Sequence, residues 1–182
     1  MGFDILLWGV LLLAIPIFGI TDIVAAVLII VALYRGKVYL ADFKRAIPFS
    51  WILLVTGLLE LLFGLIIPFS DIATTVLYIW RCGLIIPLLT YIISGIKELA
   101  IVGENKEIHD MSERLKKPIF ISACLCAVLV TLGTFFSWIN PFEIAAKIFL
   151  AVIIIMLLQV IFRCYKELNV YPGAVSDDEE NI

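Results

Sequence analysis

The sequence predicts an all-α membrane protein, with six transmembrane helices arranged as three tandem hairpins and both termini in the cytoplasm. Three observations support this prediction: a very apolar composition, an acidic turn that occurs three times, and an uneven distribution of basic residues. Of the 182 residues, 63% are hydrophobic and 16% are charged, and the mean hydropathy is +1.14. Soluble domains are about half apolar and carry more surface charge, so lipid is the simplest solvent for this chain.

The acidic turn separates two apolar runs each time that it occurs. Its copies are Thr21–Ala25 (TDIVA), Ser70–Thr74 (SDIAT) and Phe142–Ala146 (FEIAA). Each contains an acidic residue followed by Ile, then small residues, and then a new hydrophobic stretch. This pattern predicts that each turn joins the two helices of a hairpin.

The first hairpin is predicted from the long apolar run near the start of the chain. Residues 3–34 are nearly all apolar, and one helix of that length would measure ~48 Å, whereas the hydrocarbon core is ~30 Å thick. Pro16, Gly19 and Asp22 offer a break in the middle. A five-span alternative, in which this run crosses once and the N-terminus lies outside, stays open. The two spans predicted here are Ile5–Ile20 and Asp22–Leu40.

The later apolar runs predict two further hairpins, because each run has about the 20 residues that a helix needs to cross a bilayer. All spans belong to one transmembrane domain over residues 1–170, with hairpins near 5–40, 48–99 and 118–168. Residues 171–182 form an acidic polar tail that we expect to be disordered. The four later spans are predicted at Pro48–Ile67, Asp71–Gly95, Pro118–Trp138 and Phe142–Arg163.

The distribution of basic residues predicts the orientation. All but two of the 13 basic residues lie between spans two and three, between spans four and five, or at the end of span six. The exceptions, Arg81 and Lys147, lie within spans. The positive-inside rule therefore places both termini and the two longer loops in the cytoplasm and the three acidic turns outside. This is the orientation of a multi-pass protein of the cytoplasmic (inner) membrane.

The loop between spans four and five contains a second amphipathic pattern. Ile108, Met111 and Leu115 recur at helical spacing within residues 104–117. The segment is either a short amphipathic helix on the inner leaflet or a solvated connector, and the sequence favours neither. His109, the one histidine of the chain, lies here and is expected at the surface.

The sequence contains no motif that is typical of an enzyme. It has no nucleotide-binding loop, no nucleophile with an adjacent base and no metal-ligand cluster. The four cysteines lie in apolar runs and are expected to be buried thiols. We therefore expect a non-enzymatic protein with no catalytic residue, no cofactor, no metal and no nucleic-acid partner.

The second and third hairpins are repeats of each other. Ile96–Leu99 (IKEL) closes the second and Tyr165–Leu168 (YKEL) closes the third. The segment Trp51–Pro68 (WILLVTGLLELLFGLIIP), with glycines seven residues apart, resembles the core motif of the HdeD-like acid-resistance membrane proteins. The glycine-bearing stretch Gly83–Gly95 is similar to the second helix of that motif.

The resemblance to HdeD-like proteins covers nearly the whole chain. It departs most in the first hairpin, and the acidic tail is not part of the pattern. The family is known for survival of acid stress and has no agreed mechanism. The resemblance therefore implies a small inner-membrane stress protein and no catalytic residue.

Glu60 and Arg81 are the sharpest candidates for an intramembrane site. Glu60 lies eight residues before Pro68, and Arg81 lies ten after Asp71, so an antiparallel hairpin would place both ~12–15 Å below the outer turn. A charge in the membrane is costly, and similar depth on adjacent helices predicts an ion pair. Such a pair either gates a proton or substrate path or locks span three against span four. We favour the structural role, in which the pair holds span three against span four, because a single ion pair is not enough to relay protons across a membrane.

The three outer carboxylates are predicted to cap helices. Asp22, Asp71 and Glu143 each precede an apolar run, where a carboxylate meets the positive end of the helix dipole. An alternative hypothesis is acid sensing, since protonation would remove that interaction. Glu143 and Lys147 are four residues apart and are expected to form an interfacial ion pair.

The leading functional prediction is a non-enzymatic multi-pass protein of the cell membrane that acts in envelope or acid stress or as a scaffold. Its expected partners are the lipid bilayer and either further copies of itself or another membrane protein, and the sequence identifies no small-molecule ligand. The first alternative is a transport component, such as the substrate-binding subunit of a vitamin-type importer. The second is an accessory subunit of a larger complex.

Overall fold

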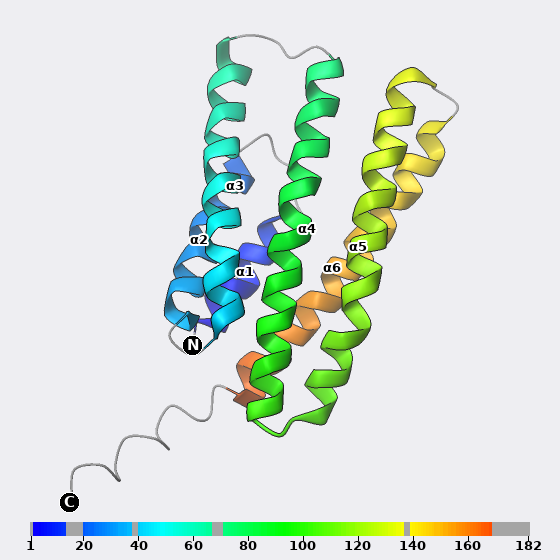
Figure 1. Ribbon diagram of the computed structural model, residues 1–182. Coiled ribbons are helices and arrows are strands. Elements are labelled where there is room, and N and C mark those ends of the chain that lie inside the picture. Colours follow the sequence, from blue (N-terminus) through cyan, green and yellow to red (C-terminus); the bar gives the residue numbers. More distant parts are fainter. Residues whose placement is uncertain (1, 14–19, 38–39, 67–70, 137–138, 169–182) are drawn as a thin grey trace, which may run out of the picture.

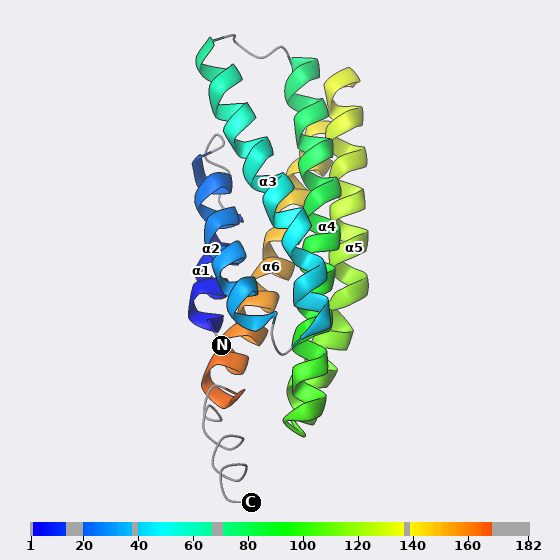
Figure 2. The same ribbon diagram turned by 60° about the vertical axis from the view of Figure 1, so that its left-hand side comes forward.

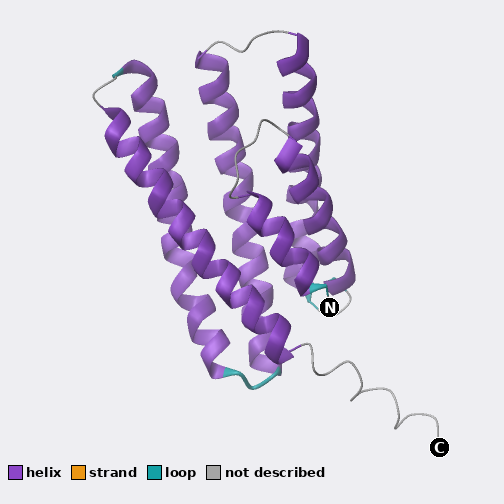
Figure 3. Cartoon of the chain, turned by 180° about the vertical axis from the view of Figure 1, so that it is seen from behind, coloured by secondary structure: helices purple, strands orange, loops and turns teal. Residues whose placement is uncertain are grey.

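The computed structural model describes residues 2–13, 20–37, 40–66, 71–136 and 139–168. Helices account for nearly all of these residues, and no strand occurs among them (Figure 3). The predicted all-α class is therefore confirmed. The acidic tail lies outside the described residues. The helices are α1 (Phe3–Leu13), α2 (Ile20–Gly36), α3 (Ala41–Ile66), α4 (Asp71–Val102), α5 (Lys106–Phe135) and α6 (Asn140–Leu168).

Four of the helices are long and apolar enough to cross a membrane. Their apolar stretches are Ala41–Leu62, Ile79–Val102, Lys106–Gly133 and Ile144–Glu167, in α3 to α6 respectively. Many large side chains on their outer faces are apolar and exposed, as expected where lipid covers a protein; Phe120 is 55% exposed and Ile148 is 61% exposed. These features indicate a membrane protein.

The first two helices are short in the part of the chain that the structure describes, and residues 14–19 and 38–39 of the spans predicted for them lie outside it. As described, α1 has 11 residues and α2 has 17, which correspond to about 17 Å and 26 Å of helix. Both lengths fall below the ~30 Å of a hydrocarbon core. The reason lies in the sequence, because two helices and their connection share a run that holds fewer than the ~40 residues that two full spans need.

The six helices pack in a closed ring. Each helix contacts its neighbours in the sequence, and α1 also packs against α6. Figures 1 and 2 show that the start of α1 and the end of α6 lie at the same end of the bundle, together with the α2–α3 and α4–α5 connections. In both views the start of α2 lies well below the far ends of α3 and α4. The α1–α2 pair therefore flanks only part of the height of the bundle.

Phe43 joins α2, α3 and α4 near that shared end. Its ring is buried between Gly36 and Gly95, and a Cβ atom on either glycine would come within 2.4 Å of the ring. Such close approach needs residues without a side chain. Gly9 plays a similar part in α1, where a Cβ atom would lie 2.7 Å from the side chain of Ile29 in α2.

The segment before Pro118 is the start of α5 rather than a separate element. α5 runs without a break from Lys106, and the side chain of Asn105 caps it by accepting a hydrogen bond of 3.1 Å from the backbone N–H of Ile108. Ile108 and Leu115 belong to the buried core. The segment is therefore neither a helix lying on the leaflet nor a solvated connector, because its apolar face is buried inside the bundle.

Polar side chains join the ends of α4, α5 and α6 at this end of the bundle. Asn105 donates a hydrogen bond of 2.6 Å to Glu167. Ion pairs join α4 to α5 and α6 to α5. We call the residues involved the polar end cluster: Lys97 with Glu113, Arg163 with Glu107, and Asn105 with Glu167.

Candidate functional site

A buried ion pair lies where three helices meet. Arg81 Nη2 on α4 donates to Asp22 Oδ1 at 2.5 Å and to the backbone carbonyl of Leu13 at 3.3 Å. The Arg81 side chain is 16% exposed and that of Asp22 is 4% exposed. Asp22 lies in the first turn of α2, and Leu13 is the last described residue of α1.

The contact of Arg81 with the Leu13 carbonyl satisfies the end of α1. The last carbonyls of a helix have no partner within it, and the positive guanidinium suits this negative end. The carboxylate of Asp22 suits the positive end of α2 for the same reason. Arg81 thus ties the end of α1 and the start of α2 to the middle of α4.

The partner of Arg81 is not the one predicted. Glu60 on α3 is half-buried and interacts electrostatically with both Arg81 and Asp22, but in the described part of the chain no ion pair joins it to Arg81. The prediction assumed that Asp22 lies at the level of the outer turns. Because the α1–α2 pair is short, α2 begins at the depth of Arg81 instead.

α3 and α4 are joined by a different contact beside the ion pair. The indole Nε1 of Trp80 donates to Thr56 Oγ1 at 3.1 Å, and that hydroxyl donates to the carbonyl of Ile52 at 2.9 Å. This hydrogen bond between Trp80 and Thr56 was not predicted from the sequence. Thr56 lies one helical turn before Glu60, and Trp80 is next to Arg81. Their similar depth on adjacent helices could therefore have predicted this contact.

The other two outer carboxylates stay predictions. Asp71 is the first residue of α4, and Glu143 lies in the first turn of α6, but both side chains lie outside the described set. Their capping and acid-sensing roles, and the Glu143–Lys147 pair, are therefore untested. Asp22 also lies in a first turn, but it is buried against Arg81 rather than turned outward, which corrects its assignment as an outward-facing cap.

A cavity of about 300 Å³ lies beside the ion pair, between α1, α4, α5 and α6. Arg81 and Lys147 are the two charged residues among those that line it. Both lie at the end of the cavity nearest the starts of α4 and α6, which run in the same direction (Figure 1). Farther along these helices the lining is apolar and ends at Leu89 and Ile154. The cavity thus has one cationic end and one apolar end.

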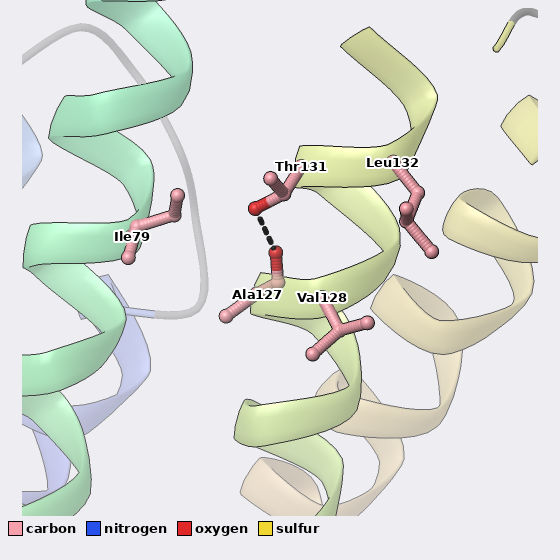
Figure 4. A pocket seen from close by; sticks show the side chains of 5 residues that line it. All are labelled: Ile79, Ala127, Val128, Thr131 and Leu132. Carbon is pink, nitrogen blue, oxygen red and sulfur yellow. Dashed lines mark hydrogen bonds between the residues drawn. The ribbon is translucent and has the colours of Figure 1, made fainter. Parts of the chain in front are cut away.

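A second hollow is a shallow groove of about 280 Å³ between α4 and α5. Figure 4 shows its lining of Ile79, Ala127, Val128, Thr131 and Leu132. The hydroxyl of Thr131 donates to the carbonyl of Ala127 at 2.7 Å. The one side-chain polar group of the groove is therefore satisfied within its own helix, and the groove offers an apolar surface of the kind that lipid chains cover.

The described residues contain no group of three or more His, Cys, Asp or Glu side chains arranged to hold a metal ion. The four cysteines form no disulfide in this part of the chain; Cys82, Cys126 and Cys164 are buried, and Cys124 is half-buried. The thiol-bearing Cys82 also lines the cavity. The chemistry of the site is therefore that of a fixed cation beside an apolar chamber.

Comparisons with known proteins found no matching family model, no matching curated protein and no matching solved structure. The resemblance to HdeD-like proteins thus stays a prediction.

Proposed function

We propose that the chain is a non-enzymatic multi-pass protein of the cell membrane, built from three tandem hairpins with both termini in the cytoplasm. The observation that carries this proposal is the set of four long apolar helices with apolar outer faces. The basic loops and both described chain ends gather at one end of the bundle (Figure 1). By the positive-inside rule, this gathering supports a cytoplasmic position for that end.

Cysteine labelling tests the orientation. We expect Phe142→Cys, at the start of α6, to react with a membrane-impermeant maleimide in intact cells. Lys106→Cys, at the start of α5, and Asp4→Cys, near the start of α1, should react only after permeabilisation. The wild-type chain, with its four native cysteines, measures the background. Labelling of Lys106→Cys in intact cells would show that the orientation is the reverse of the proposed one. Labelling of Asp4→Cys but not of Lys106→Cys in intact cells would favour the five-span alternative.

Within this class we propose a role in envelope or acid stress, which rests on the resemblance of Trp51–Pro68 to the HdeD-like motif. A transport component is the second candidate, and the cavity favours it. A chamber with two cations and apolar walls suits a small ligand, and pockets for such ligands start near 300 Å³.

Purification from its native membrane in mild detergent separates the two candidates. We expect the chain to purify as a homo-oligomer or alone if it acts in stress response. Stoichiometric co-purification of an ATPase subunit would contradict the stress proposal and support the transport component.

A further inference from the structure

We propose that the cavity beside Arg81 binds a small amphiphile with one carboxylate head and an unbranched apolar tail. This inference goes beyond the proposed function, because it rests on the lining of the cavity and holds for a stress protein and a transport component alike. The head would lie against Arg81 and Lys147, and the tail would extend toward Leu89 and Ile154.

The head group is indicated by the two cations at one end of the cavity, Arg81 and Lys147. Arg81 Nη2 is engaged by Asp22 and Leu13, but Arg81 Nε is buried and has no hydrogen-bond partner among the described residues. A carboxylate head in the cavity would lie beside the Arg81 guanidinium, whose charge makes a hydrogen bond to the head stronger than a neutral one. Lys147 adds a second cation at the same end.

A head with one negative charge fits better than one with two. Asp22 already neutralises part of the Arg81 charge, and Glu60 adds further negative potential because it interacts with both residues. Neither acidic residue lines the cavity, but both would repel a dianion such as a phosphate monoester. Like charges within a few ångströms disfavour each other strongly in a medium of low dielectric constant.

The tail is indicated by the walls and the volume. From Arg81 to Leu89 the cavity follows eight residues of α4, or ~12 Å of helix. The lining beyond the cations is almost entirely aliphatic, and Ile119 of α5 closes the far end. With ~30 Å³ for each water-sized group, a cavity of about 300 Å³ holds roughly ten heavy atoms. Octanoate, with ten heavy atoms, is therefore the probe of choice.

The entrance lies beside Lys147. This residue is exposed and also lines the cavity, so we place the entrance of the chamber beside it.

The test is direct binding of radiolabelled octanoate to the full-length chain in nanodiscs of zwitterionic lipid, with empty nanodiscs as the background. We expect saturable binding with one octanoate per chain. Octanol, which has the same tail without the charge, should compete at least tenfold more weakly, and so should octyl phosphate. Acetate, which has the head without the tail, should not compete.

Two matched variants locate the site. Lys147→Gln removes one cation from an exposed position and should weaken octanoate binding about tenfold, as the loss of one charge-assisted hydrogen bond predicts. Ala151→Leu adds three carbons to the cavity wall and should abolish binding. Ala127→Leu makes the same change in the outer groove of Figure 4 and should leave binding unchanged. Thermal unfolding of each variant without octanoate shows that the fold is retained.

Four results would overturn the proposal. Octanoate binding that does not saturate above the empty-nanodisc background would remove the site. Equal binding of octanol would remove the role of the cations, and tighter binding of octyl phosphate would replace the carboxylate by a phosphate head. Binding that survives Ala151→Leu but is lost in Ala127→Leu would move the site to the outer groove. None of these results depends on the orientation of the chain or on its partners.

Discussion

Arg81 makes the polar contacts that join α4 to α1 and α2 inside the bundle. It binds the carboxylate of Asp22 and the carbonyl of Leu13, and it lines the cavity. Its position within an apolar run revealed it in the sequence, because an intramembrane charge needs a partner. Which carboxylate serves as that partner depends on how deep α2 begins. That depth follows from the packing of a short helix pair against α4, and spacing along the chain does not encode it.

Removing one member of the ion pair should destabilise the fold more than removing both. Arg81→Gln leaves the Asp22 carboxylate buried without a partner, which typically costs about 3–5 kcal/mol. We expect Asp22→Asn combined with Arg81→Gln to recover most of that loss, because two neutral amides need no counter-charge. The measurement is thermal unfolding of each purified variant in nanodiscs.

Glu60→Gln serves as the control for this prediction. It should be milder than Asp22→Asn, and its effect should add to that of Arg81→Gln rather than couple with it. Strong coupling of Glu60 with Arg81, and none of Asp22 with Arg81, would restore the pairing that the sequence predicted.

At the scale of helices, the sequence predicted the apolar centres well and the ends less well. The predicted start at Asp71 is the start of α4, and the predicted spans 48–67 and 142–163 lie almost wholly within α3 and α6. The helices continue beyond the apolar runs, because hydropathy marks where lipid ends and not where helical hydrogen bonding ends. α5 begins at Lys106, well before the predicted start at Pro118, because the side chain of Asn105 caps it there.

Substitution of Gly95 tests how closely α4 approaches α3. Gly95→Ala would place a methyl group 2.4 Å from the Phe43 ring, and such overpacking costs about 1–3 kcal/mol. Gly83 lies in the same helix, and a Cβ atom added there would meet nothing within 4 Å. Gly83→Ala should therefore be neutral or stabilising by up to about 1 kcal/mol, since alanine is the better helix former. Equal loss of thermal stability in both variants would show that Phe43 moves aside.

At the scale of the whole molecule, the ring of helices combines an apolar exterior with polar contacts at one end. The composition and the basic loops predicted this division between lipid and water. They did not predict the contact of α1 with α6 that closes the ring, because helix order along the chain does not specify which distant helices meet. Nor did they reveal the cavity, whose walls come from four helices.

The limited height of the α1–α2 pair also has an electrical consequence. A transmembrane voltage falls mainly across hydrocarbon, and it falls most steeply where the hydrocarbon is thinnest. In the proposed membrane arrangement, water and head groups would approach more closely on the side of the α1–α2 pair, and the field would be concentrated near the start of α2. Moving one elementary charge through 100 mV changes its energy by about 2.3 kcal/mol. Arg81 and Asp22 lie at this step as a fixed dipole, so a membrane potential would act on Arg81, which borders the cavity, and on its ion-pair partner.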